Sequence, residues 1–380
     1  MQKISILSLH LWYGGIEKSI AALANILCEK YQVEIACVYK LNDKCVFDLD
    51  DRVNIKYLNP ESIVPNRDSF KEAVAVRNFY KIFKESYTAS KVLYYRKKSM
   101  VNYIKNCDSD IIISTRDIFN TWTGLYAKPG VVKIGWEHNH YHDNMKYANK
   151  VINSAKKLDY FVLVSSSLRD FYSKKLDKCK CVYIPNCIEY IPDKKSKLDK
   201  KRLISVGRLS PEKGYLDLLK VYNKVIIDYP DWNLDIIGDG VEKEKLEEYI
   251  SKNSLTGVTL HGFQGKDYIE KVMLDSSIYL MTSFTESFGI VLIEAMSYGL
   301  PCIAMNSAEG ALDIIEDNYN GYLIDNRSAD MMASKIGELI NDKEKRIELG
   351  DNALKSVSKY TSGIVGKEWY KLIEESGANE

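Results

Sequence analysis

The chain has 380 residues and a formal net charge of +1 at pH 7. It is too long for one ordinary hydrophobic core, because single cores stop growing at about 250 to 300 residues, so two domains are expected. The near-neutral balance excludes a whole-chain preference for polyanions, and electrostatic targeting must come from local patches. Eight scattered cysteines without a secretory signal favour reduced thiols over a disulfide framework.

The first half alternates short apolar runs with longer amphipathic segments. Ile4–Leu9 predicts a buried strand, followed by a glycine loop and a helix from Glu17 to Lys30. Further strands are predicted at residues 33–39, 110–114, 133–136, 160–164 and 181–184. This alternation is typical of a parallel sheet covered by helices on both faces.

The alternation restarts after a lysine-rich stretch at 194–202. Arg202–Val206 predicts a strand, Gly207 begins a loop, and Gly214–Tyr229 predicts a helix. Further helices are predicted at residues 242–252, 287–298, 331–341 and 347–359. The sequence therefore predicts two doubly wound α/β domains that meet near Pro185, and ligands bind such sheets at the carboxyl ends of their strands.

Two glutamates at 286 and 294 flank an apolar run. Ser287, Phe288 and Gly289 follow the first of them and are expected at the start of a helix, where free backbone amides favour a phosphate. Glu294 lies among apolar neighbours, where a carboxylate usually has a specific partner. The structural alternative is a pair of solvated helix acids, with Glu286 complementing the helix dipole.

Two cations stand five residues apart in the loop that starts at Gly207. Arg208 offers a fork of donors and Lys213 a point charge, a pairing suited to a diphosphate. The alternative is a solvated basic loop. Gly14 and Gly15 could likewise be a phosphate-approach loop or a tight turn, since two glycines are weak evidence.

Three of the five histidines fall in one stretch after a predicted strand, at His138, His140 and His142. Metal binding, hydrogen bonding to a polyhydroxylated substrate and a plain structural role are all open there, and metal is the least favoured.

Residues 71–105 hold nine basic and two acidic side chains, a local charge of +7, interleaved with seven aromatic residues. Such a segment suits the headgroup layer of an anionic membrane, and Arg96, Lys97 and Lys98 are its densest basic run. A solvated helical hairpin is the equally weighted alternative. Nucleic acid is not expected, because no recognised binding motif accompanies the patch.

Taken in order, these motifs resemble those of the family 4 retaining glycosyltransferases. The resemblance rests on Glu-Ser-Phe-Gly-Ile-Val-Leu-Ile-Glu-Ala at 286–295, Gly-Arg-Leu-Ser-Pro-Glu-Lys-Gly at 207–214, Ile-Pro-Asn at 184–186, Ile-Gly-Asp-Gly at 237–240 and Gly-Gly-Ile-Glu at 14–17. The motifs cover the second half densely and the first half thinly. One departure is Asp313, where the family usually has glutamate.

The resemblance implies a GT-B fold, with two Rossmann-like domains facing across a cleft. Residues 1–185 would form the acceptor-binding domain and residues 186–361 the nucleotide-sugar-binding domain. Residues 362–380 would form a helix that packs back on the first domain, which suits Trp369 and Tyr370.

The resemblance also implies roles for individual residues. Arg208 and Lys213 would hold the diphosphate and stabilise the leaving group. Glu294 would bind the ribose hydroxyls and Glu286 the donor sugar. The amides of Phe288 and Gly289, with neighbouring Ser287, would contact the sugar and the phosphate. The glycine loop at Gly14 and Gly15 would also contact the donor, and His138 would lie near the transferred sugar. Gly262 and Phe263 would border the base.

The expected function is therefore a retaining hexosyltransferase that needs no metal. It would move a hexose or N-acetylhexosamine from a nucleotide sugar, with UDP favoured on family grounds, to a glycan or lipid-linked acceptor of a surface polysaccharide such as a capsule. The nucleotide sugar is a substrate, so no cofactor is expected. The protein would be cytoplasmic, with peripheral attachment at the inner face of the membrane left open.

Two alternatives remain at this point. Another GT-B enzyme, such as a sugar-nucleotide epimerase, would need extra acids and a histidine for proton abstraction. A non-catalytic nucleotide-sugar or membrane-surface binding protein would have tolerated the loss of Arg208, Lys213, Glu286 or Glu294, all of which are intact.

Overall fold

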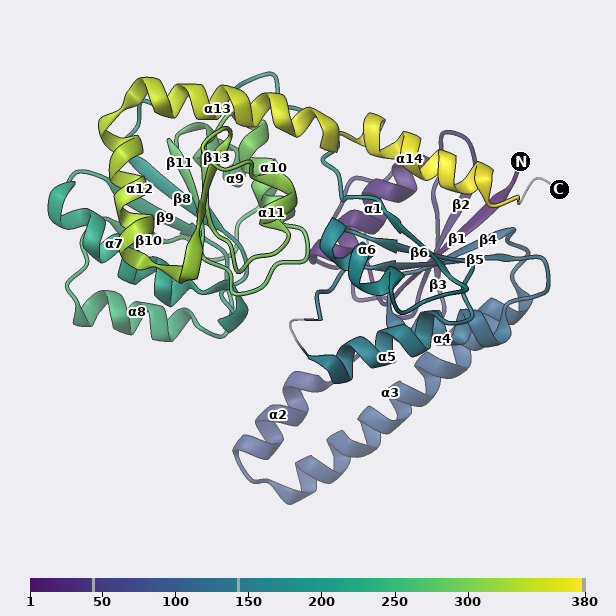
Figure 1. Ribbon diagram of the computed structural model, residues 1–380. Coiled ribbons are helices and arrows are strands. Elements are labelled where there is room, and N and C mark those ends of the chain that lie inside the picture. The colour runs from purple at the N-terminus through teal and green to yellow at the C-terminus, as the bar shows by residue number, and fades with distance from the viewer. Residues whose placement is uncertain (43–44, 142–143, 378–380) are drawn as a thin grey trace. The chain divides into compact units, whose positions relative to one another are not determined.

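The computed structural model describes residues 1–42, 45–141 and 144–377, apart from the side chains of residues 67 and 68 (Figure 1). The chain forms two units. The first comprises Met1–Val164, Leu168–Ile184 and Gly366–Glu380, and the second comprises Ser165–Ser167 and Pro185–Val365.

The first unit is built on a parallel sheet with strand order β3-β2-β1-β4-β5-β6-β7. Its strands are β1 (Lys3–Ser8), β2 (Gln32–Cys37), β3 (Asn54–Tyr57), β4 (Ile111–Ser114), β5 (Val132–Glu137), β6 (Tyr160–Leu163) and β7 (Lys180–Tyr183). All four residues of β4 are buried, which explains its continuous apolar sequence. The chain order reverses between β1 and β4, which pair in register Ile6 to Ile113.

The helices of the first unit differ greatly in length. They are α1 (Gly15–Leu27), α2 (Arg67–Ala75), α3 (Phe79–Asn106), α4 (Asp117–Tyr126), α5 (Met145–Ala155), α6 (Ser166–Ser173) and α14 (Ser362–Glu375). In α14, Trp369 is buried and packs edge-on against Trp136, with ring centroids 5.1 Å apart. The hydroxyl of Tyr370 donates to the carbonyl of Ile26 at 2.5 Å. The last helix of the chain is thereby tied to β5 and α1 of the first unit.

The second unit has its own parallel sheet, with strand order β10-β9-β8-β11-β12-β13. Its strands are β8 (Arg202–Val206), β9 (Asn233–Ile237), β10 (Val258–Leu260), β11 (Ile278–Met281), β12 (Cys302–Met305) and β13 (Gly321–Ile324). Here the order reverses between β8 and β11, which pair in register Leu203 to Ile278.

Helices again follow the strands of this sheet. They are α7 (Tyr215–Asp228), α8 (Lys243–Lys252), α9 (Lys266–Leu274), α10 (Ile290–Ser297), α11 (Ala311–Ile314), α12 (Ala329–Asn341) and α13 (Lys343–Val357), with short 3-10 turns at Pro211–Lys213, Asp325–Arg327 and Ser358–Tyr360. The core of this unit includes Leu218, Leu234, Ile303 and Ile336, none of which is measurably exposed.

The predicted fold class is confirmed, since both units are parallel α/β sheets of doubly wound order. Within the part of the chain that is described, no helix combines the length and apolar character needed to cross a bilayer.

Candidate active site

The strongest candidate site lies where the strand order of the second sheet reverses. The loop after β8 carries Arg208 and Lys213, and the loop after β11 carries Glu286. Because β8 and β11 are neighbouring parallel strands, both loops leave the same edge of the sheet. Open α/β sheets bind ligands at this kind of position.

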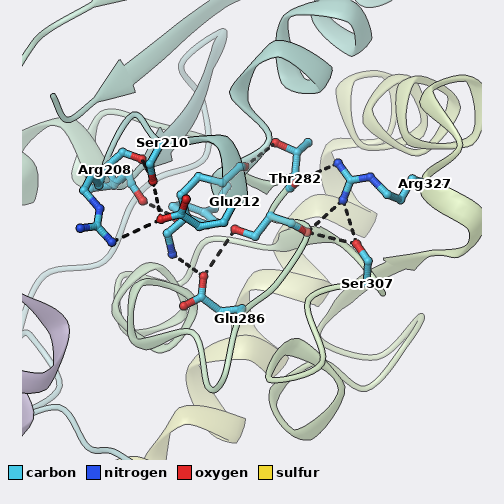
Figure 2. A network of polar contacts seen from close by, with 11 residues as sticks. Arg208, Ser210, Glu212, Thr282, Glu286, Ser307 and Arg327 are labelled. Carbon is cyan, nitrogen blue, oxygen red and sulfur yellow. Dashed lines mark hydrogen bonds and ion pairs between the residues drawn. The ribbon is translucent and has the colours of Figure 1, made fainter. Parts of the chain in front are cut away.

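Lys213 and Glu286 meet across these two loops (Figure 2). The ammonium nitrogen of Lys213 lies 2.5 Å from Oε2 of Glu286, and the two side chains are only 22% and 17% exposed. Ser283 Oγ also donates to the same carboxylate oxygen, at 3.4 Å. Partial burial reduces screening by water, so this pair is held more strongly than an exposed one.

Backbone contacts fix the two loops against each other. The amide of Phe284 donates to the carbonyl of Glu212 at 2.8 Å, and Thr282 Oγ1 donates to the carbonyl of Gly214 at 3.0 Å. Gly214 has φ +67°, and a Cβ there would overlap the carbonyl oxygen of Thr282. Glycine is therefore required for both the turn and the close approach.

Arg208, on the same loop as Lys213, interacts with Glu212. Its guanidinium reaches Oε1 of Glu212 at 3.3 Å, and Ser210 Oγ donates to the same oxygen at 2.6 Å (Figure 2). Burial alone would raise the pKa of Glu212, but the Ser210 hydrogen bond and the charges of Arg208 and Lys213 outweigh it and lower that pKa. Arg208 is 73% exposed, so its side chain can turn toward a ligand.

The helix after Glu286 begins later than the sequence suggested. The prediction that Ser287, Phe288 and Gly289 form the first turn is wrong, because α10 starts at Ile290. Gly289 is its N-cap and adopts φ +97°, a left-handed conformation that breaks the helix there. The backbone of Glu286–Gly289 is therefore a loop that leads into the helix N-terminus.

A glycine on a third loop supports this segment. The amide of Gly310 donates to the carbonyl of Glu286 at 2.7 Å, and a Cβ on Gly310 would overlap the backbone of Phe288. The Phe288 ring is buried and packs edge-on against Tyr360, with centroids 5.5 Å apart. The Phe288 side chain thus has a packing role, which leaves its backbone as the part available to a ligand.

Arg327 is a site residue that the sequence did not reveal. Its guanidinium donates to the carbonyls of Thr282 and Ser283, at 2.8 and 3.0 Å, to Ser307 Oγ at 2.8 Å and to Asp217 Oδ2 at 2.8 Å (Figure 2). It therefore holds the start of the Glu286 loop against α7 and the loop after β12. No local pattern around residue 327 signals this role.

Glu294 occupies the second turn of α10 and is half-buried. Gly262 follows β10 with φ +67°, and its carbonyl accepts a hydrogen bond from the amide of Gly238 at 2.9 Å. The neighbouring Phe263 is 54% exposed. Before this loop, His261 Nε2 lies 2.5 Å from Oδ1 of buried Asp235, which fixes the loop to the middle of β9.

Asp313, the departure from the family pattern, has partners of its own. Its carboxylate accepts the amide of Ser166 at 2.7 Å and the hydroxyl of Ser166 at 2.5 Å, and Ser166 is grouped with the second unit. The hydroxyl of Tyr360 donates to the carbonyl of Asp313 at 2.7 Å. The Asp313 carboxylate is therefore held by Ser166 within the second unit.

The other predicted donor-site residues belong to the first unit, where the glycine loop lies at the reversal point of the sheet. Gly14 and Gly15 lead into α1 after β1. A Cβ on Gly14 would overlap the carboxylate of buried Glu17, whereas Gly15 has open space above it. The guanidinium of Arg116, after β4, donates to Glu17 at 3.0 Å. Loops after β1 and β4 are thus joined by a shielded ion pair.

The histidine stretch follows β5. His138 is buried, and burial followed by the charge of Arg116 lowers its pKa to about 3, so the ring is neutral at pH 7. Its Nε2 has no hydrogen-bond partner among the described residues. His140 is buried and stacks on Tyr141, while His142 lies outside the described residues.

Glu137, beside His138, is a second titratable group that sequence reasoning did not single out. Its buried carboxylate accepts the amide of Asn139 at 2.8 Å and the hydroxyl of Tyr147 at 3.4 Å. Burial, with a smaller contribution from Asp117, raises its pKa to about 7.

Comparison with known proteins identifies the class. Residues 188–356 match the family Glycosyl transferases group 1. An uncharacterized glycosyltransferase of Haemophilus influenzae is 25% identical over 368 residues, covering 95% of this chain and 96% of that protein. An α-1,4-N-acetyl-D-galactosaminyltransferase of Campylobacter jejuni, named for an undecaprenol-linked acceptor, is 25% identical over 390 residues, covering 99% of each chain.

Solved structures agree on the fold. A TarM mutant of S. aureus, in complex with fondaparinux, α-GlcNAc-glycerol and UDP, superposes with a TM-score of 0.79 at 18% identity, covering 98% of this chain and 99% of that one. Sucrose-phosphate synthase from Thermosynechococcus elongatus also gives 0.79, at 17% identity and full coverage of both chains.

The protein is a glycosyltransferase with the GT-B fold, and its residues 188–356 match the model of the Glycosyl transferases group 1 family. It resembles bacterial enzymes of surface polysaccharide and lipid-linked glycan synthesis. The comparisons lend no support to an epimerase or to a non-catalytic binding protein.

Proposed function

We propose that this enzyme transfers a hexose or N-acetylhexosamine from a UDP-sugar. The observation that carries the proposal is the Lys213–Glu286 pair at the strand reversal of a Glycosyl transferases group 1 segment. UDP is the nucleotide in the bound TarM complex, which supports its choice as donor.

The pair offers complementary chemistry to a sugar diphosphate. When a donor binds, its diphosphate becomes the counterion of Lys213, which frees the Glu286 carboxylate to accept hydrogen bonds from the sugar hydroxyls. Arg208, whose side chain is 73% exposed, turns from Glu212 to the same diphosphate. Glu294, in the second turn of α10, then accepts hydrogen bonds from the ribose hydroxyls.

Transfer requires the bond between the sugar and the diphosphate to break. Negative charge grows on the diphosphate as it leaves, and Arg208, Lys213 and the amides at the start of α10 stabilise that charge. We propose that this charge stabilisation replaces a metal ion. As the bond between the sugar and the diphosphate breaks, the acceptor hydroxyl bonds to the sugar from the same face and passes its proton to the leaving diphosphate oxygen, so that configuration is retained. His138, neutral at pH 7, and the Gly14–Gly15 loop are assigned to the same reaction by family resemblance.

The proposed acceptor is a glycan or lipid-linked glycan of a surface polysaccharide. Its support is the undecaprenol-linked acceptor named for the Campylobacter jejuni relative, together with the poly(ribitol-phosphate) and poly(glycerol-phosphate) named for two others. Such an acceptor would bring the enzyme to the inner face of a membrane as a peripheral protein.

The experiment is a screen of UDP- and GDP-sugars for nucleotide release, each with and without EDTA. The proposal expects release from at least one UDP-sugar, unchanged by EDTA. Activity that EDTA removes and a divalent ion restores would overturn the metal-free mechanism, and release from GDP-sugars alone would overturn the choice of UDP.

A further inference from the structure

The hairpin of α2 and α3 is anchored at one end only (Figure 1). The second half of α3 enters the core of the first unit, where Val92, Met100 and Ile104 are buried in the same cluster as Phe119 and Trp122 of α4. Every residue of α3 is described, and none before Val92 is buried. The first half of α3 therefore extends from the unit with α2 as its neighbour.

One face of α3 carries tyrosine and lysine in strict alternation. The members of this Tyr–Lys stripe are Tyr80, Lys84, Tyr87, Lys91, Tyr94 and Lys98. Their spacings of four and three residues place them on a single side of the helix. All six are exposed, and the three tyrosines are 79%, 69% and 57% exposed in chain order. At a rise of about 1.5 Å per residue, the stripe runs for roughly 27 Å.

The tip of the hairpin, beside this face, also exposes apolar groups. Phe79 and Phe83 are 84% and 76% exposed, and Val76, in the turn before α3, is 60% exposed. Large apolar side chains with so little cover mark a surface that binds something apolar. The acidic Glu85 is turned inward, where its carboxylate accepts the amide of Asn66 at 2.7 Å.

We propose that the Tyr–Lys stripe and the Phe79–Phe83 tip dock on the surface of a bilayer that contains anionic lipids. Tyrosine rings suit the headgroup layer, because one end is apolar and the other can be hydrated. Lysines bury their stems and extend their charges to the phosphates. The exposed phenylalanines enter the boundary of the acyl chains.

Two other occupants fit less well. A second copy of the hairpin would bring two surfaces of charge +7 together, and like charges repel. A soluble polyanion would satisfy the lysines but would leave Phe79 and Phe83 in water. Arg96, predicted as part of the basic patch, is half-buried and lies against Tyr39, whereas Lys97 and Lys98 are exposed.

The docking inference deepens the proposed peripheral location and rests on it, but its test measures vesicle binding and not catalysis. The full chain is sedimented with vesicles of phosphatidylcholine alone and of phosphatidylcholine with phosphatidylglycerol. The triple variant Lys84→Gln, Lys91→Gln, Lys98→Gln should bind the anionic vesicles about a hundredfold more weakly. A matched control, Lys174→Gln, Lys175→Gln, Lys178→Gln, removes three exposed lysines elsewhere in the first unit and should bind as the unaltered protein does.

A second variant, Phe79→Ser with Phe83→Ser, tests the apolar part. It should weaken binding while leaving the circular dichroism spectrum and UDP release unchanged. Equal binding by the stripe variant and its control would overturn the inference. So would binding of soluble polyphosphate without binding of vesicles, or a dimer in sedimentation equilibrium that the stripe variant abolishes.

Discussion

Lys213 and Glu286 are 73 residues apart in sequence, yet the ammonium nitrogen of one lies 2.5 Å from a carboxylate oxygen of the other. They come from loops that follow adjacent strands of one sheet, at the point where the strand order reverses. We propose that a bound diphosphate replaces Glu286 as the counterion of Lys213, and that the freed carboxylate then accepts hydrogen bonds from the donor's hydroxyls.

Replacing Lys213 tests this exchange directly. Lys213→Met keeps the length of the side chain and removes its charge, so the leaving diphosphate loses a stabilising cation. We expect UDP release to fall by about a hundredfold or more in kcat. The control is Lys224→Met, which removes an exposed lysine paired with Asp330 at 2.8 Å and should leave kcat unchanged. Full activity of the Lys213 variant would refute the assignment.

Gly310→Ala tests the support of the Phe288 backbone. Gly310 has an ordinary φ of −62°, so the only new feature is a Cβ that overlaps that backbone. We expect a loss of about 1 to 3 kcal/mol in the free energy of unfolding and a raised KM for the donor. Gly363→Ala, where a Cβ meets open space, is the matched control. Equal unfolding midpoints for the two variants would argue against the close contact.

Arg327→Lys tests the scaffold behind Glu286. Lysine keeps the charge but cannot reproduce the fork that binds two carbonyls, a hydroxyl and a carboxylate. We expect a loss of about 2 kcal/mol in the free energy of unfolding, together with weaker donor binding. As a comparison, Lys224→Met breaks an exposed ion pair with Asp330 and should change neither the free energy of unfolding nor donor binding. Unaltered donor affinity in the Arg327 variant would confine its role to stability.

Glu137→Gln tests the buried carboxyl beside His138. Burial raises the pKa of Glu137 from 4.5 to about 7, so between these values the folded state binds more protons than the unfolded state. Its contribution to stability is therefore present below about pH 4.5 and lost as pH rises through 7. His138 has the opposite sign, because its pKa is lowered from 6.5 to about 3 and its contribution is lost as pH falls.

The measurement is chemical unfolding of the unaltered protein and the Glu137→Gln variant at pH 5 and pH 8. Glutamine stays neutral at both pH values. The free energy of unfolding of the variant, relative to that of the unaltered protein, should therefore be higher at pH 8 than at pH 5. A constant difference in the free energy of unfolding would mean that Glu137 does not titrate in this range.

The sequence predicted the parts of the fold that depend on local pattern. The apolar run Arg202–Val206 predicted a strand, and the position of the loop with Arg208 and Lys213 followed from where that strand ends. The predicted start of α10 was wrong because the helical pattern of the sequence continues through Ser287 and Phe288. Only the left-handed conformation of Gly289 interrupts the helix there.

Long-range contacts could not be predicted from the sequence, for a physical reason. Arg327 binds Asp217 across 110 residues, and one charged side chain in a turn does not indicate its partner. The orientation of α3 was missed for another reason, since counting charges ignores helical phase. Arg96 lies 16 residues after Tyr80, which is about 160° round the helix, so it faces away from the Tyr–Lys stripe.

We infer that Lys213 and Glu286 form the donor site of a UDP-sugar transferase. The most direct test is thermal unfolding of the unaltered protein and Lys213→Met, each with and without UDP at saturating concentration. Ligand that binds only the folded state stabilises it, and UDP at about a hundred times its Kd should raise the midpoint of the unaltered protein by roughly 5 to 10 °C. We expect that shift for the unaltered protein and little or none for Lys213→Met. No shift in the unaltered protein, or an equal shift in both, would contradict it.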